Sequence, residues 1–230
     1  MKEFELLSLS HLLGFSICLA AIVFIPKVIQ AKPGLINFSR YLLIILLFEN
    51  QIRSTYVETL IKGGNLLENL PLHLCDFSAI VIAVFLLTGF RPLFIFAYFW
   101  GITGAGMSIL TPDSEFAFPH YEYFATMYGH SLILVAVVFS IINLGQRPYF
   151  KDIPKLIFYS STLLVIMYGV NFILGANYWY LNERPFGNNI LSLMPEPPIH
   201  MLILYPVAIF FIYLVYSPYI YLDKKNRRIN

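Results

Sequence analysis

The chain has 230 residues, of which 58% are hydrophobic, 17% aromatic and only 12% charged, with a formal net charge of +2 and a mean hydropathy of +0.71. Soluble domains carry about a quarter of their residues as charged side chains, so this composition excludes a soluble enzyme. Disorder is excluded as well, because disordered chains are poor in aromatic residues and rich in charge. The small net charge gives no indication of a nucleic-acid partner.

Seven apolar segments are long enough to cross a bilayer, which requires roughly 20 residues of helix. We therefore expect an all-α, polytopic bundle of about seven transmembrane helices that forms a single domain. In chain order the predicted spans are residues 6–25, 40–57, 72–90, 92–110, 121–144, 155–175 and 199–221. Proline, glycine and asparagine mark the breaks between them. The first segment lacks a small-x-small cleavage site, so we interpret it as a span and not as a signal peptide.

Lysine and arginine are distributed unequally between the two sets of loops. Eleven lie in the first, third and fifth loops and the C-terminal tail, against three on the opposite side. The positive-inside rule then predicts an outward-facing N-terminus and a cytoplasmic C-terminus. The eleven are Lys27, Lys32, Arg40, Arg91, Arg147, Lys151, Lys155, Lys224, Lys225, Arg227 and Arg228. Tyr216, Tyr219 and Tyr221 at one end and Tyr178-Trp179-Tyr180 at the other predict interfacial aromatic belts.

Polar side chains inside the spans are costly and are therefore candidates for function. In chain order they are Glu49, Asn50, Arg53, His73, Cys75, Asp76, His120, Glu122, His130, Asn171 and His200. Glu49 and Arg53 are four residues apart on one helix face, so their alternative role is to neutralise each other.

Three of these side chains are predicted to lie at one depth. With a rise of about 1.5 Å per residue, Cys75 and His130 each lie roughly 21 Å above the inner end of their helix, and Arg53 roughly 20 Å. A thiol, an imidazole and a cation at one level suit nucleophilic catalysis. The thiolate attacks, the imidazole takes its proton, and the cation or an amide donor stabilises an oxyanion. An acyl chain in the outer leaflet would bring its ester carbonyl close to this depth.

Structural interpretations stay open for these residues. Cysteine behaves as a small hydrophobe, so Cys18 is expected to pack in its apolar span, and Cys75 is left between packing and reactivity. A disulfide between them is not expected. His120 follows a proline near the interface, where a hydrogen-bonded histidine is common. Several candidates are possible zinc ligands, but no His-x-x-x-His or Cys-x-x-Cys pair occurs, so no metal site and no cofactor are predicted.

A series of short motifs extends from the second predicted span to the start of the seventh. They are Glu49-Asn50, Leu70-Pro71-Leu72-His73-Leu74-Cys75-Asp76, Gly104-Ala105, Leu110-Thr111-Pro112-Asp113, Phe118-Pro119-His120, the lone His130 and Asn177-Tyr178-Trp179-Tyr180-Leu181. Together they resemble the YwaF-like family of bacterial membrane proteins. That family is similar to an animal transmembrane acyltransferase that remodels polyunsaturated ether phospholipids. More distantly, it resembles the androgen-induced membrane hydrolases of fatty-acid esters of hydroxy fatty acids.

The resemblance implies a cysteine nucleophile at Cys75 and a histidine partner at His130. His120 remains the alternative base. The bacterial members of the family imply a multi-pass protein of the bacterial cytoplasmic membrane. The resemblance does not identify the acyl donor, the acceptor or the headgroup.

The leading hypothesis is an outward-facing, thiol-dependent lipid acyltransferase or lipid esterase that acts on glycerophospholipid acyl chains. Its partner would be a membrane phospholipid or lysolipid, and its oligomeric state is open. The predicted supporting residues, which would bind substrate, stabilise an oxyanion or orient an imidazole, are Glu49, Arg53, His73, Asp76, His120, Asn171 and Tyr178. One alternative is a membrane solute-binding or transport protein that uses the same polar layer. A zinc-dependent membrane hydrolase is the other.

Overall fold

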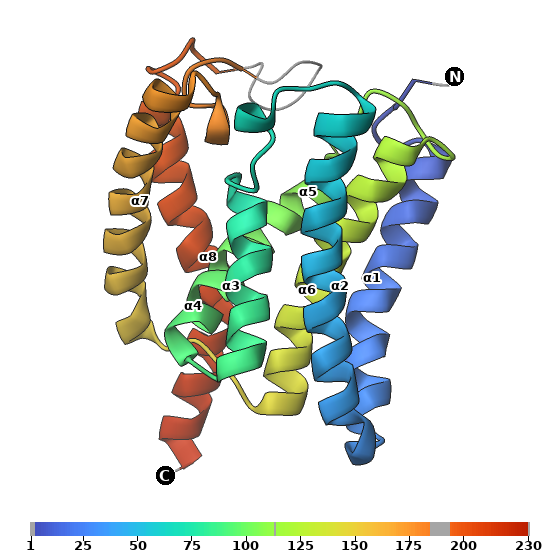
Figure 1. The fold of residues 1–230 in the computed structure, drawn as a ribbon. Coiled ribbons are helices and arrows are strands. Elements are labelled where there is room, and N and C mark those ends of the chain that lie inside the picture. Colours follow the sequence, from blue (N-terminus) through green and yellow to red (C-terminus); the bar gives the residue numbers. More distant parts are fainter. Residues whose placement is uncertain (1–2, 113, 185–193, 230) are drawn as a thin grey trace.

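The computed structural model describes residues 3–112, 114–184 and 194–229, with side chains up to residue 223. Within these residues the chain forms a helical bundle, with one isolated β-bridge between Glu3 and Phe116 (Figure 1). Six of the described helical stretches are long and apolar enough to span a membrane, and a seventh apolar helix is shorter. The helices are α1 (Leu9–Gln30), α2 (Ile36–Tyr56), α3 (Leu74–Thr88), α4 (Arg91–Trp100), α5 (Gly106–Leu110), α6 (Tyr121–Leu144), α7 (Ile153–Leu174) and α8 (Met201–Ile229). The predicted all-α membrane bundle is confirmed, whereas Asp113 of the sequence motifs lies outside the described residues.

Helix α6 is the centre of the bundle and packs against α1, α2 and α3. Nearly every residue from Ser131 to Ser140 is buried, which places this helix inside the protein rather than at the lipid surface. The seam with α1 depends on Gly14, because a Cβ there would lie 2.3 Å from the Tyr123 hydroxyl. A left-handed Gly145 (φ 64°) ends the helix, a conformation in which glycine carries no steric penalty.

The predicted fourth span is one bent helical unit with a change of winding in its middle. Helix α4 passes into the π-helical segment η4 (Gly101–Ala105), and α5 completes the span. Glycine permits this winding and lets η4 approach α6, since a Cβ on Gly101 would lie 3.2 Å from Ile133. Single π-helical turns inside helices are frequent at functional sites.

Helix α3 is the short member of the bundle. It begins at Leu74, after an irregular segment, and reaches only about 22 Å at 1.5 Å per residue. Figure 1 shows it starting well below the upper end of α2. Irregular backbone at membrane depth occurs only where protein covers it or where it lines a wet cavity. The start of α3 is therefore a special position in this bundle.

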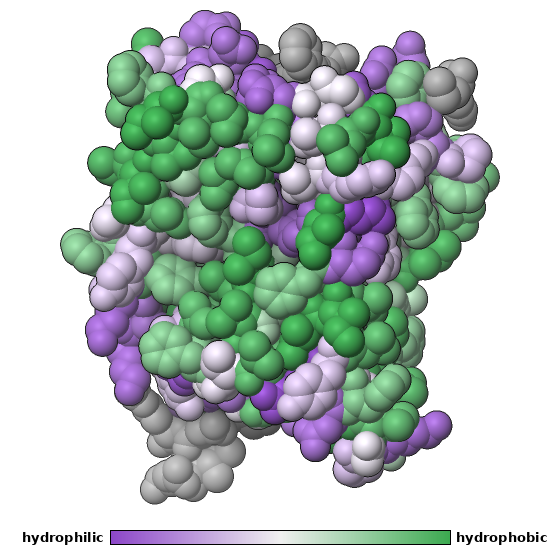
Figure 2. Space-filling model, in the orientation of Figure 1, coloured by the Kyte–Doolittle hydropathy of each residue, from purple (hydrophilic) through white to green (hydrophobic). Residues whose placement is uncertain are grey.

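The outside of the bundle is largely apolar. Figure 2 shows broad hydrophobic areas on the viewed face, with polar patches between them and at both ends. Phe172, Ile173 and Leu202 are among the most exposed large apolar side chains. A surface of this kind is covered by lipid in a membrane protein.

The predicted aromatic belts are only partly correct. Tyr221 is 70% exposed, as a belt residue should be, but Tyr178 and Tyr216 are fully buried. Each buried ring has an internal hydroxyl partner: Tyr178 donates to Leu67 O, and Tyr216 donates to Asp223. These tyrosines hold loops and helices together, a role that composition near a span end does not reveal.

Candidate functional site

One turn of α2 contacts both of the helices that carry the predicted catalytic pair. The buried Gln51 donates from Nε2 to Asp76 Oδ1 of α3 at 3.1 Å. The neighbouring Asn50 lies against Gly129 of α6, where an added Cβ would be 2.9 Å from Asn50 Nδ2. Because Asn50 and Gln51 are consecutive, Asp76 and Gly129 lie at the same level of the bundle. We call this level the polar layer; it comprises Asn50, Gln51, Cys75, Asp76, Gly129 and His130.

Cys75 is the second residue of α3 and is half-buried against the main hydrophobic core. Its thiol lies beside the backbone N–H groups of Cys75 and Asp76. The first N–H groups of a helix have no carbonyl partner within the helix, and the helix dipole is positive at this end. Both features favour a negatively charged sulfur, whereas burial and the neighbouring Asp76 carboxylate oppose it more strongly.

The carboxylate of Asp76 fastens the start of α3. Its Oδ2 accepts from the backbone N–H of His73 at 2.9 Å, and its Oδ1 accepts from Gln51. Asp76 is therefore bonded to the chain just before Cys75 and to α2. The proposed role in which Asp76 orients an imidazole has no counterpart among the described hydrogen bonds.

His130 is half-buried on α6, and its Nδ1 lies 2.8 Å from the carbonyl oxygen of Thr126. A carbonyl oxygen can only accept, so Nδ1 carries the proton and Nε2 presents a lone pair. This is the tautomer that a general base needs.

No hydrogen bond joins Cys75 to His130 in the part of the chain that the structure describes. Each of them is adjacent in sequence to a residue that contacts α2, so both lie in the polar layer. The described arrangement thus places a thiol and an imidazole at one level without pairing them.

Arg53 is held on the α2 surface by several partners. Its Nε donates to Glu49 at 3.0 Å, one Nη donates to Asn50 and the other to the Tyr121 hydroxyl. The guanidinium also lies over the Tyr121 and Tyr128 rings, at 5.8 and 5.7 Å. Glu49 and Arg53 therefore do neutralise each other, and through Asn50 they are linked to the polar layer.

Asn171 and Tyr178 form a fold-back at the end of α7. Asn171 Nδ2 donates to Tyr178 O at 2.9 Å, and Tyr178 N donates to Asn171 Oδ1 at 2.8 Å. The Tyr178 hydroxyl donates to Leu67 O and accepts from Leu70 N. Both side chains are buried and tie the 66–70 segment to α7. The structure places them above α3 as a clamp on the chain that leads to Cys75.

The next residues extend this clamp. Trp179 Nε1 donates to Leu72 O at 2.8 Å, and the His73 ring lies 5.2 and 5.5 Å from the rings of Tyr178 and Tyr180. Trp179 and Tyr180 have φ values of 61° and 52°, which is unusual for bulky residues and marks a strained backbone. Burial lowers the pKa of His73, so its imidazole is neutral near pH 7.

His120 lies apart from the polar layer, at the N-terminal cap of α6. Its Nδ1 accepts from Glu122 N at 3.4 Å, and its ring lies 4.7 Å from that of Phe116. Beside it Lys62 bridges Glu58 and Glu122. Burial alone would lower the pKa of Lys62, but the hydrogen bonds to Glu122 and Glu58 outweigh it and raise the pKa. These groups form a charged cluster at the end of α2.

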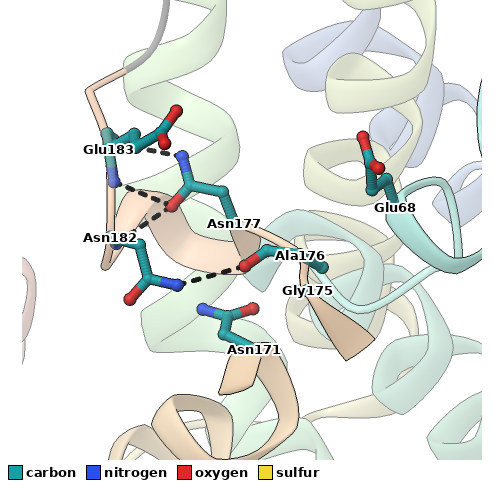
Figure 3. Close-up of a pocket in the computed structure, with 7 residues that line it drawn as sticks. All are labelled: Glu68, Asn171, Gly175, Ala176, Asn177, Asn182 and Glu183. Atoms are coloured by element: carbon teal, nitrogen blue, oxygen red, sulfur yellow. Dashed lines mark hydrogen bonds between the residues drawn. The ribbon is translucent and has the colours of Figure 1, made fainter. Parts of the chain in front are cut away.

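A polar pocket of about 330 Å³ opens at the end of α7 (Figure 3). Its lining residues are Glu68, Asn171, Gly175, Ala176, Asn177, Asn182 and Glu183. The Asn177 side chain accepts from the backbone N–H groups of Asn182 and Glu183, which shapes one wall. The lining offers amides and two carboxylates to a polar guest.

Sequence reasoning missed Gln51, Thr126 and Gly129. Gln51 is a buried amide within a span, and this feature alone could have identified it as a candidate. Thr126 contributes only its carbonyl oxygen and Gly129 only its lack of a side chain, so neither has a signal in the sequence. Within the described residues, no group of three or more His, Cys, Asp and Glu side chains is arranged to hold a metal ion.

The fold and the polar layer define the class: a multi-pass helical membrane protein with buried polar side chains at the start of a short span. Residues 4–216 match the sequence profile of the TMEM164 family, and the chain belongs to that family. A protein of Treponema pallidum (strain Nichols), described only as uncharacterized, is 27% identical over 162 residues. These cover 70% of this chain and 66% of that protein, so the chain spans slightly less than two thirds of the relative. No solved structure matches the chain.

Proposed function

We propose that the chain is a thiol-dependent lipid acyltransferase or lipid esterase, with Cys75 as nucleophile and His130 as general base. The observation that carries the proposal is the position of Cys75. It is the second residue of the short helix α3, which starts below the upper end of α2, and backbone N–H groups lie at its sulfur (Figure 1). The resemblance of the sequence motifs to those of the YwaF-like family, which is itself similar to an acyltransferase, supports the same assignment.

In the first half-reaction His130 Nε2 accepts the thiol proton and the sulfur attacks the ester carbonyl carbon of a phospholipid. The resulting oxyanion would be stabilised by the N–H groups of the first turn of α3 that lie beside the sulfur. Collapse breaks the ester C–O bond, and the departing lysolipid oxygen takes the proton from His130. Cys75 then carries the acyl group as a thioester.

In the second half-reaction an acceptor hydroxyl gives its proton to His130 and attacks the thioester carbonyl. The C–S bond breaks, and the sulfur recovers the proton. A lysolipid as acceptor makes the protein an acyltransferase, and water makes it an esterase. The missing Cys75–His130 hydrogen bond is compatible with this scheme, because catalytic hydrogen bonds often shorten only when substrate binds.

The remaining predicted residues would act around this pair. Arg53 would attract the lipid phosphate at the edge of the polar layer. Asn171, Tyr178 and His73 would position the chain before Cys75 through the clamp. We further propose that this layer faces the outer leaflet of a bacterial cytoplasmic membrane, as the lysine and arginine bias indicates.

Intact-protein mass spectrometry after incubation with mixed phospholipids tests the proposal. The wild type should gain an acyl-sized mass that hydroxylamine removes. Cys75→Ala should show no gain, and His130→Ala should form the adduct at least a hundredfold more slowly, in line with the loss of a general base. Cys18→Ala is the matched control, because its thiol is buried in α1 and donates to Met127 O at 3.9 Å. Full lipid turnover by Cys75→Ala would rule the proposal out.

The second candidate function is solute binding or transport. Two observations favour it: the π-helical turn in the fourth span and the polar pocket at the end of α7. Transporters often place sites at interrupted helices. Solute binding that survives Cys75→Ala and weakens in Asn177→Leu, without any covalent adduct, would support this function over the enzyme.

A further inference from the structure

Three cations, one at the start of α4 and two between α6 and α7, lie near one tyrosine ring at the end of the bundle opposite the polar pocket. Arg147, Arg91 and Lys151 lie 4.7, 4.9 and 5.8 Å from the centre of the Tyr149 ring. Such contacts occur roughly once per 70–80 residues in proteins, so three on one ring mark an unusual concentration of positive charge. We call Arg91, Arg147, Tyr149, Lys151 and Lys155 the basic cluster.

The charges of the two arginines in the basic cluster are neutralised by carboxylates of the chain itself. Arg91 donates to both carboxylate oxygens of Asp152, at 3.1 and 2.6 Å. Arg147 donates to Asp223 of α8 at 2.6 Å and lies over the Tyr219 ring as well. These bonds fix the loop between α6 and α7 against α4 and α8, and so give the cluster a rigid base.

Among the described side chains, the two lysines of the basic cluster lack the internal ion pairs that neutralise the arginines. Lys151 and Lys155 are exposed, and neither forms an ion pair in the part of the chain with described side chains. They lie at the start of α7, where the helix dipole disfavours a cation. Apart from the Tyr149 ring beneath Lys151, no contact among the described side chains compensates this cost. This points to a negatively charged partner outside the chain.

The surroundings of the lysines indicate what that partner is. Phe150 is 58% exposed and Tyr149 is 41% exposed, and both lie within two residues of Lys151 in the chain. Exposed aromatic rings next to basic residues are typical of the membrane–water interface, the level at which lipid phosphates lie. A lipid headgroup can reach the cluster laterally at this level.

We propose that the basic cluster binds the headgroup phosphate of an anionic phospholipid, with Lys151 and Lys155 as its ligands. Tyr149 and Phe150 pack beside the glycerol and the first acyl carbons, and the Tyr149 ring holds Lys151 in place. The site is separate from the polar layer, and it stands whether or not the chain is an acyltransferase.

Native mass spectrometry of the delipidated full chain, titrated with phosphatidylglycerol, tests the site. The Lys151→Gln/Lys155→Gln double variant should bind phosphatidylglycerol more weakly by about fivefold per lysine removed. Binding of phosphatidylcholine should not change. Tyr149→Leu should weaken phosphatidylglycerol binding less, because both lysines remain. Thermal melting of each variant establishes that it is folded.

Lys32→Gln is the matched control, because this exposed lysine lies in another loop, forms no ion pair within the described residues and is not part of the cluster. If Lys32→Gln and the double variant lost the same amount of phosphatidylglycerol binding, the binding would be a general electrostatic attraction. That outcome would overturn the site. So would unchanged phosphatidylglycerol binding by a folded double variant. Displacement by soluble glycerol phosphate at the same concentration as lipid would overturn the lipid assignment.

Discussion

Cys18 and Cys75 are the only two thiols of the chain, and they lie in two contrasting regions. Cys18 is in the middle of α1, in the seam with α6, where its thiol meets a carbonyl oxygen. Cys75 is at the first turn of α3, where its thiol meets N–H groups. A carbonyl favours the protonated thiol, and N–H groups favour the thiolate. Burial disfavours the thiolate of both residues, and the Asp76 carboxylate adds to this effect at Cys75. What distinguishes Cys75 is therefore its half-buried position at the start of a helix.

The difference should be largest in alkylation. We expect a membrane-permeant maleimide to label Cys75 faster than Cys18, because Cys75 is half-buried at a helix start whereas Cys18 is buried in the seam between α1 and α6. Peptide mass spectrometry of a time course in Cys18→Ala and Cys75→Ala proteins measures the two rates separately. Equal labelling rates at Cys18 and Cys75 would contradict the difference between the two regions.

A smaller loss is expected when the support of Cys75 is removed. Gln51→Leu deprives Asp76 Oδ1 of its donor, which should cost about 1–3 kcal/mol of stability. Misplacement of the α3 start should slow adduct formation on the order of tenfold or more. Gln30→Leu is the matched control, because this exposed side chain makes only a long bond to Ile142 O. A similar melting temperature and rate for both variants would contradict the support role.

Glycine substitutions test how tightly the polar layer is packed. Gly129→Ala places a Cβ against Asn50 and should destabilise the protein by about 1–3 kcal/mol, the usual cost of overpacking. Gly104→Ala meets no atom within 4 Å and should be neutral or stabilising, since alanine favours helix. Thermal unfolding in one detergent compares them. A neutral Gly129→Ala would show that α2 and α6 have room to separate.

The smallest effect is a pH dependence at the clamp. The pKa of His73 is lowered by burial, so between that pKa and the model-peptide value of about 6.5 the unfolded chain binds more protons. Stability from this group is complete above pH 6.5 and is lost as pH falls through the folded-state pKa. The melting temperature of the wild type should fall from pH 7 to pH 5 by more than that of His73→Gln. Parallel curves would exclude a buried neutral His73.

Much of the fold follows from the sequence, because span length and loop punctuation are local properties. The seven apolar segments are visible in this way. The start of α3 is not, since hydropathy alone extends that span to Leu72. The helix begins later because Asp76 caps it through the backbone N–H of His73. The tertiary bond from Gln51 to Asp76 and the clamp on Leu72 then hold this start in place.

The candidate site was less accessible from the sequence. Depth counting brought Cys75 and His130 to one level, but it could not give their partners. Asn171 was predicted as a possible oxyanion donor, whereas its amide is bonded to the backbone of Tyr178. Such pairings depend on a loop fold-back, which neither periodicity nor spacing encodes.

The short length of α3 is also expected to make the protein sensitive to the thickness of the bilayer. A helix of about 22 Å faces a hydrocarbon layer of about 30 Å, so the adjacent leaflet is expected to dip toward the start of the helix. Such a dip would bring interfacial water and ester groups down to Cys75, so that a lipid need not leave the membrane. The thickness of the bilayer would then control the rate of lipid turnover. Reconstitution in short-chain lipids should raise turnover relative to long-chain lipids of the same headgroup.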